Sequence, residues 1–141
     1  MAKRPKRKRI ALRYPKHALS PEDLLHFIES TVFIKAWDDL GLNDEEDLTA
    51  LQLSIMCAPK EAPVVPGTGG LRKLRFAPVK WRTGARGATR VCYVFFEEHG
   101  IVLLVYVYDK HEKDDLTAAE KREIHAYIRR QEQALKRRGS V

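Results

Sequence analysis

Two apolar runs separated by a short polar turn constrain this chain more than any other feature. Residues 90–96 are rich in β-branched and aromatic side chains, residues 97–100 have the character of a hairpin turn, and residues 101–108 are almost entirely apolar. An apolar run of that length is typical of a strand covered on both faces. We therefore expect a hairpin whose second strand lies at the centre of a sheet.

Start and stop signals indicate two helices before this hairpin. Residues 31–40 place apolar side chains on one helical face and are followed by Gly41, a common terminating residue. Asn43 is suited to cap a second helix, and Glu46 follows three residues later at the spacing of a capping box. Pro59 ends this second helix.

A short strand and a last helix complete the pattern. Residues 71–76 alternate between apolar and basic side chains, which places Lys73 and Arg75 on one face of a strand. After the hairpin, Thr117 and Glu120 form another capping box and open the last helix. Strands joined by short turns, with helices around them, predict an α+β domain built on a small antiparallel sheet flanked by helices.

The segment before the first helix fits two structures. Ser20 and Pro21 form a good helix start, and apolar side chains four residues apart would continue that helix. The alternation within residues 24–30 fits a strand equally well. Propensity alone does not decide between them.

Positive charge is concentrated in two places, although the whole chain carries a formal charge of +7. Residues 1–21 hold eight Lys or Arg side chains and no acid, so the remainder is close to neutral. Within that remainder, residues 72–90 hold seven basic side chains and no acid. Such a block repels itself unless an anion meets it. The sequence therefore predicts a local anion-binding surface rather than a uniformly basic protein.

The basic N-terminus sets the expected domain boundary. Residues 1–23 are a basic extension, expected to be flexible until bound, and residues 24–141 form the folded domain. Three explanations of this extension are equally good. It contacts RNA phosphates, it is a solvated tail, or its start codon has been assigned too far upstream.

Several classes of protein are not supported. No apolar run reaches the roughly 18 residues of a membrane helix, and the N-terminus lacks the apolar core of an export signal, so we expect a cytoplasmic protein. Cys57 and Cys92 are far apart and form no CxxC motif, and the histidines are scattered, so neither a disulfide scaffold nor a metal site is expected. Residues 67–73 are rich in glycine but lack phosphate-loop spacing. We expect no cofactor.

Four segments together resemble the RelE/HigB group of bacterial toxins, part of the RelE/ParE superfamily. They are residues 30–33, 67–75, 86–93 and 107–117, and the segments GTGGLRK and EKDDLT at this separation are a fairly specific pair. The resemblance covers about residues 25–130. The family's fold implies that residues 25–30 form the first strand rather than a helix.

The resemblance implies a function and a set of partners. Such toxins cut mRNA in the ribosomal A site, beside the 16S rRNA, without a metal ion. A cognate antitoxin with a helix-turn-helix DNA-binding domain neutralises them, and they meet operator DNA only through this antitoxin. No membrane partner is implied.

The resemblance also implies a catalytic site. Cleavage by the ribose 2′-hydroxyl needs a base, cations around the pentacovalent phosphorane and an acid for the leaving oxygen. Lys73 and Arg75 match the family's basic strand residues, with Lys73 as a candidate proton carrier. Arg90 matches an arginine that clamps the scissile phosphate, for which a guanidinium fork is suited. Lys110 and His111, after the last strand, complete the catalytic set.

His111 follows Asp109 with one residue between, as the catalytic histidine of some HigB proteins follows an acid, and Asp109 is a candidate to orient its ring. Some relatives instead use a tyrosine shortly afterwards, but residues 115–117 contain none. His111 or a lysine would then take that role, while Tyr93 is expected in the core. Contacts with the RNA backbone are assigned to Arg72, Arg82, Arg86 and Lys113.

Two other functions remain open at this point. The first is a ParE-like protein that inhibits gyrase without catalysis on the same fold. The second is a catalytically inactive protein that binds nucleic acid through residues 1–21. The basic residues predicted at the site favour the nuclease.

Overall fold

The computed structural model describes residues 19, 21–78, 89–109 and 115–139, so the basic extension lies almost wholly outside the described residues. The predicted order of strands and helices is confirmed. In chain order the elements are η2 (Pro21–Asp23), β1 (His26–Glu29), α1 (Thr31–Asp39), α2 (Glu46–Cys57), β2 (Arg72–Phe76), β3 (Thr89–Phe96), η4 (Glu97–His99), β4 (Ile101–Asp109) and α3 (Ala118–Gly139).

The four strands form one sheet in the order β1-β4-β3-β2, which places β4 inside the sheet as predicted. β2, β3 and β4 pair antiparallel, but β1 pairs parallel with β4, so the sheet is mixed rather than wholly antiparallel. The tight turn at η4 requires β3 and β4 to be antiparallel. The long connection from β1 to β4 imposes no such direction. The α+β class is confirmed.

The segment before α1, which fitted either a helix or a strand, contains a short form of each. Only one 3-10 turn, Pro21–Asp23, forms at the predicted helix start. The chain then enters β1, as the family resemblance implied. Hydrogen bonds to β4 thus decide the structure of residues 26–29, because pairing within the sheet satisfies their backbone groups.

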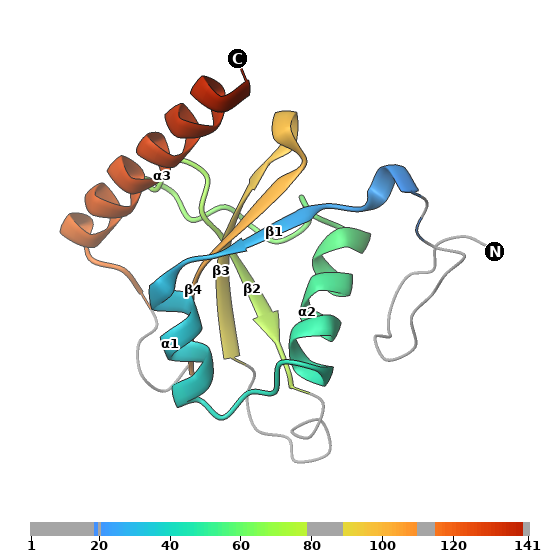
Figure 1. The fold of residues 1–141 in the computed structure, drawn as a ribbon. Coiled ribbons are helices and arrows are strands. Elements are labelled where there is room, and N and C mark those ends of the chain that lie inside the picture. The colour runs from blue at the N-terminus through green and yellow to red at the C-terminus, as the bar shows by residue number, and fades with distance from the viewer. Residues whose placement is uncertain (1–18, 20, 79–88, 110–114, 140–141) are drawn as a thin grey trace.

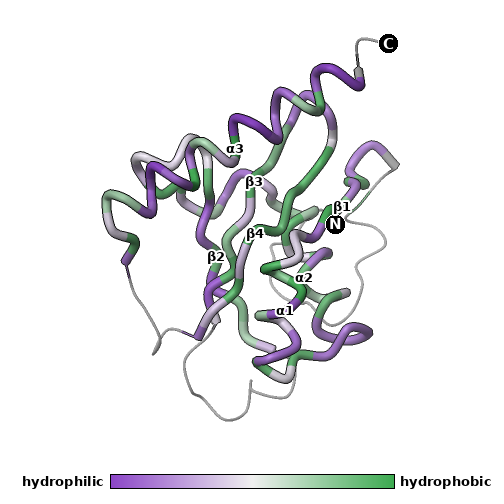
Figure 2. The backbone as a smooth tube through the Cα atoms, turned by 60° about the vertical axis from the view of Figure 1, so that its left-hand side comes forward, coloured by the Kyte–Doolittle hydropathy of each residue, from purple (hydrophilic) through white to green (hydrophobic). Residues whose placement is uncertain are grey.

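Helices cover both faces of the sheet. α3 lies on one side of it, and α1 and α2 lie together on the other (Figures 1 and 2). On the α1/α2 face, Trp37 and Leu51 belong to one buried cluster with Val91 of β3. On the α3 face, Ile128 belongs to a second cluster with Val94.

Hydropathy along the chain agrees with these two layers. β4 is mostly hydrophobic, whereas α3 is mostly hydrophilic with hydrophobic residues at intervals (Figure 2). One helical stripe is therefore enough to hold α3 on the sheet. In the described ranges, no helix combines the length and the apolar character needed to cross a membrane.

A β-bulge interrupts the pairing of β3 with β4. Cys92 is opposite Tyr106 and Tyr93 is opposite Leu104, so Val105 is an extra residue in β4. A bulge of this kind bends a strand and redirects the side chains beyond it. It therefore separates the end of β4 that carries Tyr106 from the end that pairs with β1.

Ser30 connects this bulge to the start of α1. Its hydroxyl oxygen accepts a hydrogen bond from the Phe33 amide at 2.9 Å, as an N-cap should, and the same hydroxyl donates to the Val105 carbonyl at 2.8 Å. One side chain therefore both caps the helix and satisfies a carbonyl at the irregular point of the strand.

The two predicted capping boxes have different outcomes. The box at α3 is confirmed, because the Thr117 hydroxyl accepts from the Glu120 amide and the Glu120 carboxylate accepts from the Thr117 amide. At α2, Asn43 does accept from the first-turn amides, but the carboxylate that receives the Asn43 amide belongs to Asp47, not Glu46. Asp47 is buried, whereas Glu46 points to solvent.

The glycine-rich segment before β2, residues 67–70, packs against α3. Thr68 is fully buried, donates to the Val65 carbonyl at 2.7 Å and accepts from the Leu71 amide at 3.1 Å. Gly69 has a φ of +80°, and a Cβ there would fall on the His125 ring of α3. Gly69 allows helix and loop to approach closely, so the segment has a packing role.

Candidate functional site

Strand alternation places the predicted catalytic residues of β2 on the α3 face of the sheet. Leu74 and Phe76 pack into the cluster beneath α1 and α2. Lys73 and Arg75 therefore point to the opposite face. On β3, Val91 packs beneath α1 and α2, so Arg90 shares the face of Lys73 and Arg75. We refer to Lys73, Arg75 and Arg90 as the basic cluster.

The register joins this cluster to two tyrosines of β4. In one row across the sheet, Arg75 is opposite Arg90, and Arg90 is opposite Tyr108. In the next row, Lys73 is opposite Cys92, and Cys92 is opposite Tyr106. Residues directly opposite each other have Cβ atoms roughly 4.5–5.5 Å apart. The structure thus brings together the three described members of the predicted catalytic set.

The electrostatics of the basic cluster favour an anion. Arg75 is exposed, and Lys73 and Arg90 are half-buried, so all three charges lie where solvent or a ligand reaches them. Like charges directly opposite one another on a sheet are destabilising. An anion held between Arg75 and Arg90 would meet two guanidinium groups, whose planar shape suits the oxygens of a phosphate.

Neither Cys92, which lies next to the cluster, nor Tyr93, which lies on the opposite face of the sheet, is a suitable nucleophile or base. Burial raises the pKa of the Cys92 thiol to about 11, although the nearby Lys73 ammonium acts in the opposite direction. Burial likewise raises the pKa of Tyr93 to about 12, and its hydroxyl donates to the Pro59 carbonyl at 2.8 Å. Both side chains stay protonated at neutral pH, and Tyr93 is a core residue as predicted.

A groove of about 870 Å³ lies between the first half of α3 and the sheet. Its floor includes Lys73, Cys92 and Tyr106, so it continues directly from the basic cluster. Its other walls come from the start of α1, the segment before β2 and α3. They include Ser30, Val32, Val64, Glu120, Glu123 and Ile124.

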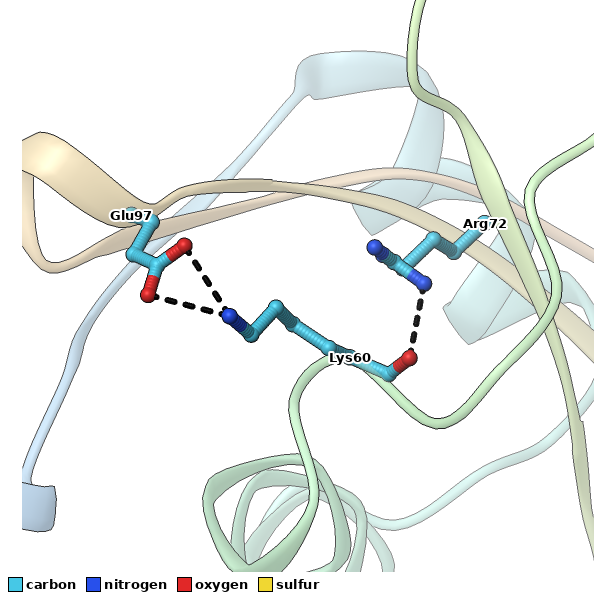
Figure 3. A network of polar contacts seen from close by, with 3 residues as sticks. All are labelled: Lys60, Arg72 and Glu97. Carbon is cyan, nitrogen blue, oxygen red and sulfur yellow. Dashed lines mark hydrogen bonds and ion pairs between the residues drawn. The ribbon is translucent and has the colours of Figure 1, made fainter.

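Arg72 does not join the cluster, although it precedes Lys73. It has the same parity as Leu74 and so lies toward the α1/α2 face. Its Nη1 donates to the carbonyls of Lys60 at 2.9 Å and Ala62 at 2.7 Å. Figure 3 shows the contact of Arg72 with Lys60 beside the ion pair of Lys60 with Glu97. In this structure Arg72 fastens the segment after α2 to β2.

The remaining predicted residues cannot be placed. Arg82, Arg86, Lys110, His111 and Lys113 lie outside the described residues.

Two described residues bear on the prediction for His111. Asp109 is opposite Thr89, and alternation puts both on the α1/α2 face, away from the basic cluster. Thr117 caps α3 with its hydroxyl, which accepts from the Glu120 amide. Within the described ranges, no three His, Cys, Asp or Glu side chains are grouped to hold a metal.

The sequence reasoning missed the two tyrosines of β4. Tyr106 and Tyr108 stack with their ring centroids 5.9 Å apart and an angle of 23° between the planes. The signal was available, because two aromatic residues two positions apart on a strand share a face. The two tyrosines lie within residues 101–108, which were interpreted only as a buried strand.

No known protein-family model matches the chain. Two solved structures are similar to it. One is a mutant of the E. coli toxin RelE in the free state, with 17% identity over 64% of this chain and 88% of that one, and a TM-score of 0.48. The other is the intact E. coli RelBE toxin–antitoxin complex, with 19% identity over 60% of this chain and 95% of that one, and a TM-score of 0.46. Both belong to the group that the sequence resembles.

Proposed function

We propose that this protein is the toxin of a toxin–antitoxin pair and cuts mRNA in the ribosomal A site without a metal ion. The observation that carries the proposal is the basic cluster, in which Lys73, Arg75 and Arg90 from neighbouring strands share one partly exposed corner of the sheet. The sequence resemblance supports it independently, because these are the positions that match the family's basic residues.

The proposed reaction is an attack by the ribose 2′-oxygen on the adjacent phosphorus. The new 2′-O–P bond forms as the P–O5′ bond breaks, which leaves a 2′,3′-cyclic phosphate and a 5′-hydroxyl. The 2′-hydroxyl proton passes to a base, and the departing 5′-oxygen receives a proton from an acid. The phosphorane carries extra negative charge, which fixed cations stabilise more than they stabilise the starting diester.

The register suggests a division of labour within the basic cluster. Arg90 lies between Arg75 and Tyr108, so its guanidinium is best placed to clamp the scissile phosphate from the centre of the row. Arg75, the most exposed of the three, would meet the same phosphate from the side. Lys73 lies in the neighbouring row and is our candidate for neutralising charge and carrying a proton.

We assign the remaining proton transfer to His111, with Lys110 as an additional cation. Both follow β4 directly in the chain, and an imidazole titrates near neutral pH. General acid–base help of this kind contributes about 10²–10⁴ in rate. Thr117 is unsuited to the role, because its hydroxyl caps α3 and has no acidic proton to give near neutral pH.

RNA-backbone binding is proposed for Arg82, Arg86 and Lys113, which belong to the strongly basic stretches around the cluster. Arg72 is a weaker candidate for that role, since its guanidinium already donates to two carbonyls. The proposed partners are the ribosome at its 16S rRNA, mRNA, and a cognate antitoxin with a helix-turn-helix domain. Operator DNA would be reached only through that antitoxin, in the cytoplasm.

Controlled expression followed by mapping of mRNA ends tests this function. We expect new 5′ ends within codons positioned in the A site for the wild type, and none for Arg90→Ala. Intact messages together with a DNA-damage response would overturn the proposal in favour of gyrase inhibition. Toxicity that disappears when residues 1–21 are removed, with no cleavage in either case, would instead support the inactive nucleic-acid-binding protein.

A further inference from the structure

The two stacked tyrosines of β4 differ in exposure. Tyr108 is 6% exposed and belongs to the cluster beneath α3, whereas Tyr106 is 37% exposed. The Tyr106 ring stacks against Tyr108, which holds it in place, while 37% of the residue remains accessible. An aromatic ring that is fixed on one face and open elsewhere has the properties of a stacking platform.

Tyr106 is also placed beside the basic cluster. It lies in the same row of the sheet as Lys73, with only Cys92 between them. Two strand spacings of about 4.8 Å separate the backbones of Tyr106 and Lys73. This distance is comparable to that between a base and the phosphate of its own nucleotide, so one nucleotide can contact both side chains.

The groove in front of Tyr106 suits a base rather than a phosphate. Its volume, about 870 Å³, lies within the range of small-molecule sites, and Val32, Val64 and Ile124 give it apolar walls. On the α3 side the groove is lined by Glu120, Lys121 and Glu123, whose formal charges leave a negative excess, so this wall does not attract a phosphate. The basic cluster is therefore the place for the backbone, and the groove is the place for the base.

We propose that Tyr106 binds the substrate by stacking on an unpaired base of the mRNA next to the phosphate held by the basic cluster. This inference rests on the function proposed above and adds a contact that holds the base. Proteins commonly recognise single-stranded RNA by stacking splayed bases on aromatic side chains. Stacking is tolerant of base identity, so Tyr106 contributes affinity and alignment rather than codon preference.

Cleavage of mRNA on ribosomes with a defined A-site codon tests this contact. The proteins are the wild type, Tyr106→Phe, which keeps the ring, and Tyr106→Leu, which keeps apolar volume without it. We expect kcat/KM to fall about tenfold for Tyr106→Leu and to stay within about twofold for Tyr106→Phe. Ile34→Ala, at an exposed apolar position outside the groove, is the control and should match the wild type.

Messages with one abasic nucleotide in the A-site codon make the test independent of folding. At one position, removal of the base should slow the wild type about as much as Tyr106→Leu does, and should slow Tyr106→Leu no further. Normal cleavage by Tyr106→Leu, or losses that multiply at every position, would overturn the stacking contact alone. A wild-type protein that cuts no message would overturn the proposed function and this contact with it.

Discussion

Arg75 and Arg90 face each other across β2 and β3, on the side of the sheet that α3 covers. Like charges directly opposite each other on a sheet are in general destabilising, by about the amount that an opposite-charge pair would contribute. Binding sites often carry such a cost, because a ligand of opposite charge removes it. The pair therefore links the stability of the free protein to its proposed binding of a phosphodiester.

Replacing one member of this pair should affect stability and activity in opposite directions. We expect Arg75→Glu to raise the free energy of unfolding by about 0.2–1 kcal/mol, because it turns repulsion into attraction. The same variant should lose mRNA cleavage. Urea unfolding and cleavage on programmed ribosomes measure the two effects. Arg122→Glu, at an exposed position of α3, is the control and should leave cleavage unchanged; a fully active Arg75→Glu variant would contradict the assignment.

Gly69 should tolerate substitution less than Gly41, although both have a positive φ. Gly41→Ala meets open space and should cost roughly 1–2 kcal/mol from backbone strain alone. Gly69→Ala also places a methyl group against the exposed His125 ring, which must shift, and should cost about 1 kcal/mol more, the low end of the range for overpacking. Urea unfolding measures both variants. Adding His125→Ala to Gly69→Ala should recover most of the extra loss. Equal losses for Gly41→Ala and Gly69→Ala would show that α3 does not pack closely against Gly69.

The role of Asp47 in the cap of α2, which the sequence had assigned to Glu46, can be tested by substitution. Asp47→Ala removes the carboxylate that accepts the Asn43 amide, and we expect a loss of about 0.5–2 kcal/mol. Glu46→Ala is the matched control, because Glu46 is exposed and contributes its amide but no side-chain bond to this cap. Thermal unfolding should therefore separate the two variants. A larger loss for Glu46→Ala would restore the pattern first predicted from the sequence.

Stability should fall at alkaline pH, with a contribution from Cys92. Its pKa is about 11 in the folded protein against an ordinary value of 9.0. Above pH 9 the unfolded chain releases the thiol proton while the folded chain retains it, so stabilisation present below pH 9 is lost as pH rises to 11. Cys92→Ala should make this decline shallower by roughly 1 kcal/mol per pH unit in urea unfolding under reducing conditions. An unchanged slope would show that Cys92 ionises normally.

Local signals predicted most of the secondary structure. The apolar run of β4, the turn before it and the box formed by Thr117 and Glu120 each depend on neighbouring residues, and each is present. The direction of β1 could not be predicted, because it depends on pairing with β4 across most of the chain. Asp47 was missed because α2 starts later than expected from Asn43 as its cap. The carboxylate that accepts the Asn43 amide therefore comes one position after Glu46.

The site was predictable to the extent that strand alternation determines it. Alternation put Lys73 and Arg75 on one face, but only the register of β2 with β3 brings Arg75 opposite Arg90. Arg72 illustrates the limit, since nothing in its sequence neighbourhood reveals the carbonyls of Lys60 and Ala62 that it binds. The register that brings Tyr106 opposite Cys92 changes at a bulge, which the sequence did not reveal.

The central claim is that the basic cluster stabilises attack by a ribose 2′-hydroxyl on the next phosphate. The most direct measurement uses purified protein and programmed ribosomes with two messages, identical except that one lacks a single 2′-hydroxyl at the mapped cleavage position. We predict rapid cleavage of the ordinary message with a 2′,3′-cyclic phosphate end, no cleavage of the deoxy message at that bond, and a loss of about 10²-fold or more in Arg90→Ala. Equal cleavage of both messages, or full activity of Arg90→Ala, would contradict the claim.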